Sequence, residues 1–368
     1  MNEEKNKRKS ALNVQNGIEQ PSSLNPLLSK GLDKYKKSKT DINTLIKGLL
    51  EGHRTSLSRA ITLVESSLSS DKILAKEIIQ LCLPHSGNSI RIGITGVPGV
   101  GKSTFIETFG NMLIKNGKKV AVLAIDPSSK RTKGSILGDK TRMESLSVHK
   151  DAFIRPSASA GTLGGVARKT RETITLCEAA GFDIILVETV GVGQSEVAVA
   201  QIVDFFLLLM LAGSGDELQG IKRGIMEMAD MILINKADGD NINKANLAKR
   251  EFENALHLFP ALKNGWIPKV ATASALMKSG MEKTWETIES YVSLTKENGH
   301  FNIKRSQQSG DILRETLESS LMDDFYNTPG LKEKLTEIDN KISRGLLNPY
   351  DAAEELLRLY RKAKVRKG

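Results

Sequence analysis

The sequence predicts an α/β fold, in which a mainly parallel sheet is covered by helices on both faces and helical extensions precede and follow it. Between residues 90 and 273, short apolar runs typical of buried strands alternate with segments of helical periodicity. The first of these runs leads directly into a glycine-rich stretch that is followed by a helical segment. From about residue 301 onward the strand-like runs stop, and amphipathic helical patterns take their place.

The chain begins with a polar segment, residues 1–40, which is rich in Ser, Asn and Lys and is expected to form a flexible basic arm. Residues 41–86 show helical periodicity and predict an N-terminal helical extension, with Asp41 placed to cap its first helix. The apolar positions expected on three successive helices are Ile42, Leu45, Ile46, Leu49 and Leu50; Leu57, Ala60, Ile61 and Val64; and Ile73, Leu74, Ile78 and Ile79.

Residues 87–298 are expected to form the sheet domain, and residues 299–368 a C-terminal helical region. The predicted strands are 90–95, 119–125, 183–188, 204–211, 230–234 and 269–273. The predicted C-terminal helices include 311–325, 331–343 and 351–364, each with a charged outer face.

The net charge of +10 comes from the two ends of the chain. Residues 1–40 contain nine Lys or Arg against four Asp or Glu, and residues 361–368 contain five basic residues and no acid. A nucleic-acid-binding protein usually has a basic stripe on its folded body. We therefore interpret the basic ends as solvated tails and expect no nucleic-acid partner.

The sequence also gives expectations about the cellular compartment of the protein. No apolar run approaches the ~18–20 residues of a membrane span, and the N-terminus lacks the apolar core of a secretory signal. Cys82 and Cys177 stand alone without CxxC spacing, which predicts neither a disulfide framework nor a zinc site. We expect a cytoplasmic protein with no membrane partner.

The glycine-rich stretch GVPGVGKST satisfies the pattern G-x-x-x-x-G-K-[ST] in full, with a strand before it and a helix after it. In such a P-loop, glycines let backbone N–H groups close around phosphates, the lysine reaches the β and γ phosphates, and the serine hydroxyl binds Mg²⁺. The alternative is a glycine-rich turn of chance composition. The predicted phosphate-binding residues are Gly96, Val97, Pro98, Gly99, Val100, Gly101, Lys102, Ser103 and Thr104.

A second candidate is Glu188, at the tip of the apolar strand 183–188, where we expect it to leave the sheet before a loop that contains Gly191. In a P-loop fold an acid at this place lies near Mg²⁺ and its water. The Gly191 N–H would then meet the γ-phosphate. The alternative is a strand end that is simply exposed to solvent.

The segment NKAD, residues 235–238, is the N-K-x-D pattern by which GTPases select guanine. The Asp238 carboxylate would accept hydrogen bonds from the guanine N1–H and exocyclic amine, Lys236 would lie on the ring, and Asn235 would brace the loop. The segment TASAL, residues 272–276, matches the further motif that holds the base through Ser274, Ala275 and Leu276, with a backbone N–H meeting guanine O6.

These motifs closely resemble a known family, the methylmalonyl-CoA mutase-associated GTPases of the MeaB/ArgK type, in the G3E group of SIMIBI P-loop proteins. The resemblance extends from about residue 41 to 360. Glu188 stands where most GTPases have Asp, which is one feature that separates this family from Ras-like proteins. The stretches that resemble the family are GVPGVGKST, IDPSSKRTKGSILGDKTRM (125–143), VETVGVGQSE (187–196), GDELQGIKRGIMEMAD (215–230) and NKAD.

The resemblance implies further site residues. Asp126 and Asp139 become acids near Mg²⁺ and the attacking water, beside Ser103 and Glu188. Arg142 becomes a candidate to neutralise charge on the transferring phosphoryl group. From the residues alone the case is weaker, because Asp139 and Arg142 lie in a turn-rich loop and could simply pair with each other.

The resemblance also implies a homodimer that exchanges contacts through its C-terminal helices, and a chaperone for an adenosylcobalamin-dependent mutase. GTP binding and hydrolysis would gate cofactor delivery, so that cobalamin is handled only through the partner. A third switch, residues 213–224, would signal to the mutase. Its matching residues are Asp216, Glu217, Lys222 and Arg223.

The rate of hydrolysis can also be anticipated. Ras-like GTPases orient the attacking water with a Gln directly after the glycine that corresponds to Gly191. Here that position is Val192, and the nearest Gln is Gln194. We expect slow intrinsic hydrolysis that rises when the mutase orders the loops at 126–142 and 213–224.

Three other functions compete with this interpretation. A metal-insertion GTPase needs clustered soft or imidazole ligands, but His53, His85, His149, His257 and His300 are scattered along the sequence. A kinase or transport ATPase conflicts with the NKAD motif. A GTP-dependent assembly module, in which hydrolysis only times release, would differ from the chaperone in its turnover with and without mutase.

Overall fold

The computed structural model describes residues 41–66, 68–125, 143–156, 163–189, 195–213, 223–260 and 262–365. The chain divides into two units, Met1–Asn43 and Thr44–Gly368, and the second contains all the described strands. The arm expected at residues 1–40 lies outside the described residues.

The described strands form one sheet of seven, in the order β3-β2-β4-β1-β5-β6-β7, and every neighbouring pair is parallel. The predicted α/β fold with a mainly parallel sheet is therefore confirmed. The strand β1 lies at the centre, between β4 and β5. The strands are β1 (Ile90–Gly96), β2 (Val120–Ile125), β3 (Ala152–Pro156), β4 (Ile184–Thr189), β5 (Phe205–Leu211), β6 (Met231–Asn235) and β7 (Lys269–Thr272).

Two expectations about strands were wrong. The edge strand β3 was not predicted, because it has only five residues and ends in Arg155 and Pro156. Proline is compatible with an edge strand, where an N–H can be missing from the ladder. Glu188 does not leave the sheet, because β4 continues to Thr189. Glu188 pairs with Ile94 of β1 on one side and with Ala124 of β2 on the other.

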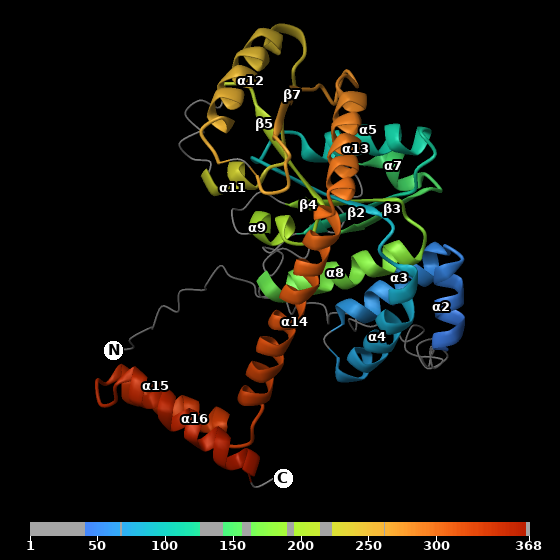
Figure 1. Cartoon of the computed structure of the whole chain (residues 1–368). Helices are drawn as coiled ribbons and strands as arrows, with labels where there is room; N and C mark the ends of the chain where they lie inside the picture. The colour runs from blue at the N-terminus through green and yellow to red at the C-terminus, as the bar shows by residue number, and fades with distance from the viewer. Residues whose placement is uncertain are drawn as a thin grey trace, which may run out of the picture. The chain divides into compact units, whose positions relative to one another are not determined.

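Helices cover both faces of the sheet, as predicted (Figure 1). On one face α5 and α13 pack through aromatic side chains, with Phe109 between Phe105 and Trp285 at centroid distances of 5.3 and 6.4 Å. On the other face α9 approaches so closely that a Cβ on Gly93 would lie 2.8 Å from Val199. The helices of this domain are α5 (Lys102–Lys115), α7 (Glu144–Val148), α8 (Leu163–Ala179), α9 (Ser195–Ala200), α11 (Arg223–Met228), α12 (Ile242–Leu256) and α13 (Met281–Glu297).

The three predicted N-terminal helices are present as α2 (Ile42–Leu50), α3 (Arg54–Glu65) and α4 (Ser69–Cys82). The Asp41 carboxylate accepts from the Asn43 N–H at 3.1 Å, as expected of a cap. Two apolar positions were placed wrongly. Leu50, the last residue of α2, is 36% exposed, and Ile73 is 72% exposed because α4 turns Ile78 toward the core instead. The helices contact the edge of the sheet through Arg155, whose Nη2 lies 2.5 Å from Glu65 Oε2.

The C-terminal helices are α14 (His300–Tyr326), α15 (Leu331–Ser343) and α16 (Pro349–Val365), and α15 and α16 lie side by side (Figure 1). A polar network joins α14 to the N-terminal ends of the strands. Arg305 binds both carboxylate oxygens of Asp204, at 2.8 and 2.7 Å, and Lys304 Nζ donates to the Asp204 carbonyl at 2.7 Å. Asp204 in turn accepts from the Arg91 N–H at the start of β1. Across the described residues, no helix is both long and apolar enough to span a bilayer.

Candidate nucleotide-binding site

The predicted motifs meet at the carboxyl edge of the sheet, where ligands bind in open α/β folds. The glycine-rich stretch begins with the last residue of β1, the NKAD segment includes the last residue of β6, and the TASAL segment includes the last residue of β7. Because β1 and β6 both neighbour β5, loops that are far apart in sequence lie together here.

The glycine-rich loop adopts a conformation that requires its glycines. Gly96 has φ +152°, and a Cβ at this position would collide with the carbonyl oxygen of Leu209 on β5. Gly101 has φ +90° and is the residue directly before α5. The helix then begins at Lys102 and Ser103, so backbone N–H groups of its first turn face the loop, which is the arrangement that binds phosphate.

The amine of Lys102 lies against this loop, where its Nζ donates to the carbonyl oxygens of Gly96 at 2.8 Å and Val97 at 3.3 Å. Burial lowers the pKa of the Lys102 ammonium, whereas the carboxylates of Glu188 and Glu196 act in the opposite direction and favour its charged form. A cation is therefore held next to the predicted phosphate site.

Ser103 and Glu188 lie together across the space between α5 and β4. The Ser103 hydroxyl donates to Glu188 Oε1 at 3.4 Å, and the Glu188 residue is only 8% exposed. A hydroxyl and a carboxylate are hard oxygen ligands of the kind that Mg²⁺ prefers. The residues at this place therefore fit a magnesium site.

Asn235 connects the phosphate loop to the predicted base site. It is buried at the end of β6, where its Nδ2 donates to the Val100 carbonyl at 2.8 Å and its Oδ1 accepts from the Ala275 N–H at 3.4 Å. Lys236 has a left-handed backbone with φ 58°, and its Nζ donates to the Gly99 carbonyl at 2.9 Å. The Lys236 side chain thus extends along the phosphate loop.

Asp238 lies beside the TASAL segment, because the Ser274 hydroxyl donates to its Oδ2. Ser274 and Ala275 are buried, whereas Leu276 is 75% exposed. A carboxylate is therefore presented next to backbone N–H groups of the turn, which is a suitable arrangement for guanine, with its adjacent donors and acceptor.

Several candidates cannot be located. Asp126, Asp139, Arg142, Gly191, Asp216, Glu217 and Lys222 lie outside the described residues, as does the side chain of Arg223, whose backbone begins α11.

Sequence reasoning missed two features of the site. Glu196 is 4% exposed and contributes its charge to the surroundings of Lys102. Its signal was its place in the stretch VETVGVGQSE, in which it had no assigned role. The hydroxyl groups of Thr95 and Thr189, 2.8 Å apart, join β1 to β4 directly below the phosphate loop. Nothing in the sequence pairs these two threonines.

Comparison with known proteins agrees with this geometry. The family model described as "Methylmalonyl Co-A mutase-associated GTPase MeaB" matches residues 57–329. A probable GTPase of Mycobacterium tuberculosis is 49% identical over 308 residues, which are 84% of this chain and 92% of that protein. The mitochondrial methylmalonic aciduria type A homolog of Mus musculus is 43% identical over 335 residues, covering 88% and 81% of the two chains.

A solved structure has the same architecture. The crystal structure of a protein named "LAO/AO transport system kinase" superposes with a TM-score of 0.68 at 36% sequence identity, and the match covers 88% of this chain and 98% of the other.

Proposed function

The chain belongs to the methylmalonyl-CoA mutase-associated GTPase family, and from this premise we propose that it gates cofactor loading and protection of an adenosylcobalamin-dependent methylmalonyl-CoA mutase by binding and hydrolysing GTP. One observation supports the nucleotide chemistry above all others. Asn235 bonds to both the phosphate loop and the base turn, so the two halves of a nucleotide site are held as one unit.

The proposed roles follow from the contacts. The Lys102 ammonium binds the β and γ phosphates in place of the loop carbonyls that it contacts in the structure. The Asp238 carboxylate accepts from guanine N1–H and the exocyclic amine, and Lys236 supports the ring. Leu276 offers its backbone N–H to guanine O6, a contact that adenine, with an amine at that position, would not match, while the Ala275 N–H stays bonded to Asn235.

Mg²⁺ would be held by the Ser103 hydroxyl and the Glu188 carboxylate, with Asp126 and Asp139 as further proposed ligands of the ion or its water. The ion supplies positive charge that neutralises the phosphates. Glu188 is buried in the sheet, so its carboxylate stays in one position while the nucleotide changes. Arg142 is the proposed cation for charge that develops on the transferring phosphoryl group.

The proposed partner is an adenosylcobalamin-dependent acyl-CoA mutase. We assign signalling to four residues that come after β5 in the sequence and precede or begin α11: Asp216, Glu217, Lys222 and Arg223. The strand β5, which precedes the segment at 213–224, lies next to β1, the strand that leads into the phosphate loop. Cobalamin would be handled only through this partner.

Single-turnover GTP hydrolysis, measured with and without purified methylmalonyl-CoA mutase, tests the proposal. We expect slow hydrolysis by the chain alone and a clear acceleration by the mutase, below the ~10³–10⁵-fold effect of an arginine finger because ordering of loops is the expected cause. Fast turnover that the mutase leaves unchanged would remove the support for both the catalytic roles and the chaperone.

The name of the solved relative raises a second function, a transport-system kinase. A kinase transfers a phosphoryl group to an acceptor other than water, and most kinases take it from ATP. Competition of labelled GTP by ATP separates the two, because an ATP affinity equal to that for GTP would favour the kinase.

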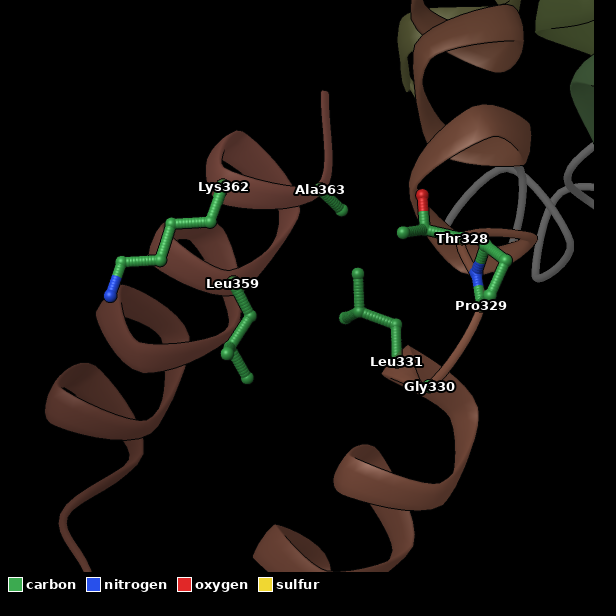
Figure 2. A pocket seen from close by; sticks show the side chains of 7 residues that line it. All are labelled: Thr328, Pro329, Gly330, Leu331, Leu359, Lys362 and Ala363. Atoms are coloured by element: carbon green, nitrogen blue, oxygen red, sulfur yellow. The ribbon is translucent and has the colours of Figure 1, made fainter. Parts of the chain in front are cut away.

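We further propose a homodimer formed through the C-terminal helices, residues 299–368. The helix α14 exposes Leu313, Leu317 and Leu321 on successive turns, with exposed fractions of 61%, 54% and 62%. Beyond it, Leu331 and Leu359 border a cavity of about 320 Å³ between the start of α15 and the end of α16 (Figure 2). A second copy would cover this apolar stripe, and the cavity offers a recess for its side chains.

Replacement of Leu317 tests this interface. The variant Leu317→Glu should be monomeric in sedimentation analysis, because a charge would have to be buried in the apolar contact. Leu247→Glu is the matched control, since Leu247 is a similarly exposed leucine, at 59%, on α12. If both variants and the unmodified protein sediment alike, α14 is not the dimer interface.

A further inference from the structure

A threonine in the helix that follows the phosphate loop makes a long-range contact with the base turn. Thr108 lies in the second turn of α5, whose first turn contains Lys102 and Ser103. Its partly buried hydroxyl donates to the carbonyl oxygen of Ala275 at 3.0 Å, between residues 167 positions apart in sequence. One helix therefore contacts both the phosphate site and the turn expected at guanine.

The tip of this turn receives little support from packing. Ser274 and Ser279 exchange backbone hydrogen bonds of 3.1 and 3.0 Å, which close the turn, and Lys278 has a left-handed φ of 56°. Leu276 and Met277 are 75% and 67% exposed. The Leu276 and Met277 side chains therefore bury little apolar surface, and hydrogen bonds of the turn help to fix their position.

Ala275 attaches this tip to the rest of the domain, together with Ser274, whose hydroxyl donates to Asp238 and accepts from the Met277 N–H. The Ala275 N–H donates to Asn235 Oδ1 at 3.4 Å, which is longer than the usual range for an N–H···O bond. The Ala275 carbonyl accepts from Thr108 at the normal distance of 3.0 Å. Of these two bonds, the one from Thr108 is the better formed.

Open space beside the turn makes this bond harder to replace. Thr108, Met112 and Lys278 border a cavity of about 490 Å³ on the surface between α5 and the start of α13. Without the hydroxyl, the turn has open space beside it into which it can move.

We propose that Thr108 is a positioning residue for guanine recognition. The Ala275 carbonyl and the Leu276 N–H belong to one planar peptide unit, so a bond that fixes the direction of the carbonyl also fixes that of the N–H. Thr108 thereby orients the backbone donors of the turn toward the 6-oxo group of the base. The inference rests on the proposed selection of guanine and assigns to it a residue outside the guanine motifs.

The test compares GTP with 2-aminopurine riboside triphosphate, which keeps the 2-amino group but lacks both the 6-oxo group and the N1 hydrogen. In Thr108→Val, which removes the hydroxyl and keeps the shape, the dissociation constants of GTP and GDP should rise by ~3–10-fold, the effect of one lost hydrogen bond. The dissociation constant of 2-aminopurine riboside triphosphate, which lacks the 6-oxo group, should not change. The value of kcat at saturating GTP should also be unchanged, and Thr108→Ser should restore GTP affinity.

Thr287→Val is the matched control, because the exposed Thr287 hydroxyl bonds only within its own helix, to the Lys283 carbonyl at 2.8 Å. It should leave both affinities unaltered. Equal weakening of both nucleotides by Thr108→Val would overturn the proposal and make Thr108 a general support of the domain. If the unmodified protein itself binds GTP and 2-aminopurine riboside triphosphate equally, the selection of guanine fails, and the role of Thr108 fails with it.

Discussion

The ion pair between Arg305 and Asp204 anchors α14 to the sheet, and its removal should be costly. Arg305 binds the carboxylate through two N–H groups, at 2.8 and 2.7 Å, while its side chain is 15% exposed and that of Asp204 is 2% exposed. Replacing Arg305 with methionine leaves a buried carboxylate without its cation. Removal of one partner from a buried pair typically costs ~3–5 kcal/mol, because the remaining charge stays in a poorly solvated place.

The lower end of that range is expected here. Asp204 still accepts from the Arg91 N–H at 2.8 Å after the substitution, so part of its hydrogen bonding remains. We therefore expect Arg305→Met to lower the free energy of unfolding by about 3 kcal/mol. The double variant Arg305→Met, Asp204→Asn should recover part of this loss, because no charge is left to bury.

Urea unfolding followed by circular dichroism measures these differences. The matched control is Arg168→Met, which breaks the more exposed pair of Arg168 with Glu172 and should cost only ~0.3–0.5 kcal/mol. The reasoning is refuted if the two arginine variants lose equal stability, or if the double variant is as unstable as Arg305→Met. GTP affinity should persist, because the pair lies at the opposite ends of the strands from the phosphate loop.

Further predictions concern the site and the pH dependence. Asp238→Asn should shift nucleotide preference from GTP toward xanthosine triphosphate, since the amide can donate to the 2-oxo group; competition titration measures this. Ser103→Ala should raise the Mg²⁺ concentration needed for half-maximal turnover, whereas Lys102→Ala should abolish hydrolysis at every Mg²⁺ concentration. Burial raises the pKa of the Asp230 carboxyl from its ordinary value of 3.8 to about 6. The folded state therefore holds the Asp230 proton more tightly than the unfolded state does. As the pH rises from 3.8 to 6, the contribution of Asp230 to the free energy of unfolding falls. Because roughly 1.4 kcal/mol corresponds to each pH unit, and part of the change is already complete at pH 4, the stability of Asp230→Asn relative to the unmodified protein should increase by ~2.4 kcal/mol from pH 4 to pH 7. Urea unfolding at the two pH values measures this difference.

The sheet was largely predictable because its buried strands are apolar on both faces. Strands such as β5 are continuous apolar runs, and the glycine-rich loop after β1 has a fixed spacing. The edge strand β3 has neither signal. It was missed because Arg155 and Pro156 give it the composition of a loop, and pairing with β2 determines its conformation instead.

The parts of the site that could not be predicted depend on contacts between distant residues. The distance between Thr108 and Ala275 follows from how α5 packs near the start of α13, and no local pattern encodes it. The same holds for Ile73, which the periodicity of α4 places on the apolar face but the packing of Ile78 leaves exposed. Periodicity indicates that a helix has an apolar face, whereas tertiary packing selects which residues lie at its centre.

The side-chain contacts at the N-terminal ends of the strands differ from those at the C-terminal ends, and this difference affects how a GTPase of this kind can signal. At the N-terminal ends of the strands, side chains fix the backbone: Asp204 accepts from the Arg91 N–H, Asp230 accepts from the Phe206 N–H at 2.8 Å, and Arg305 joins α14 to the same region. At the carboxyl edge the strands lead into loops that we assign to phosphates, base and partner. A change in the nucleotide therefore acts at one end of a sheet whose other end is fixed by side chains, so the strands are expected to keep their positions when the nucleotide changes.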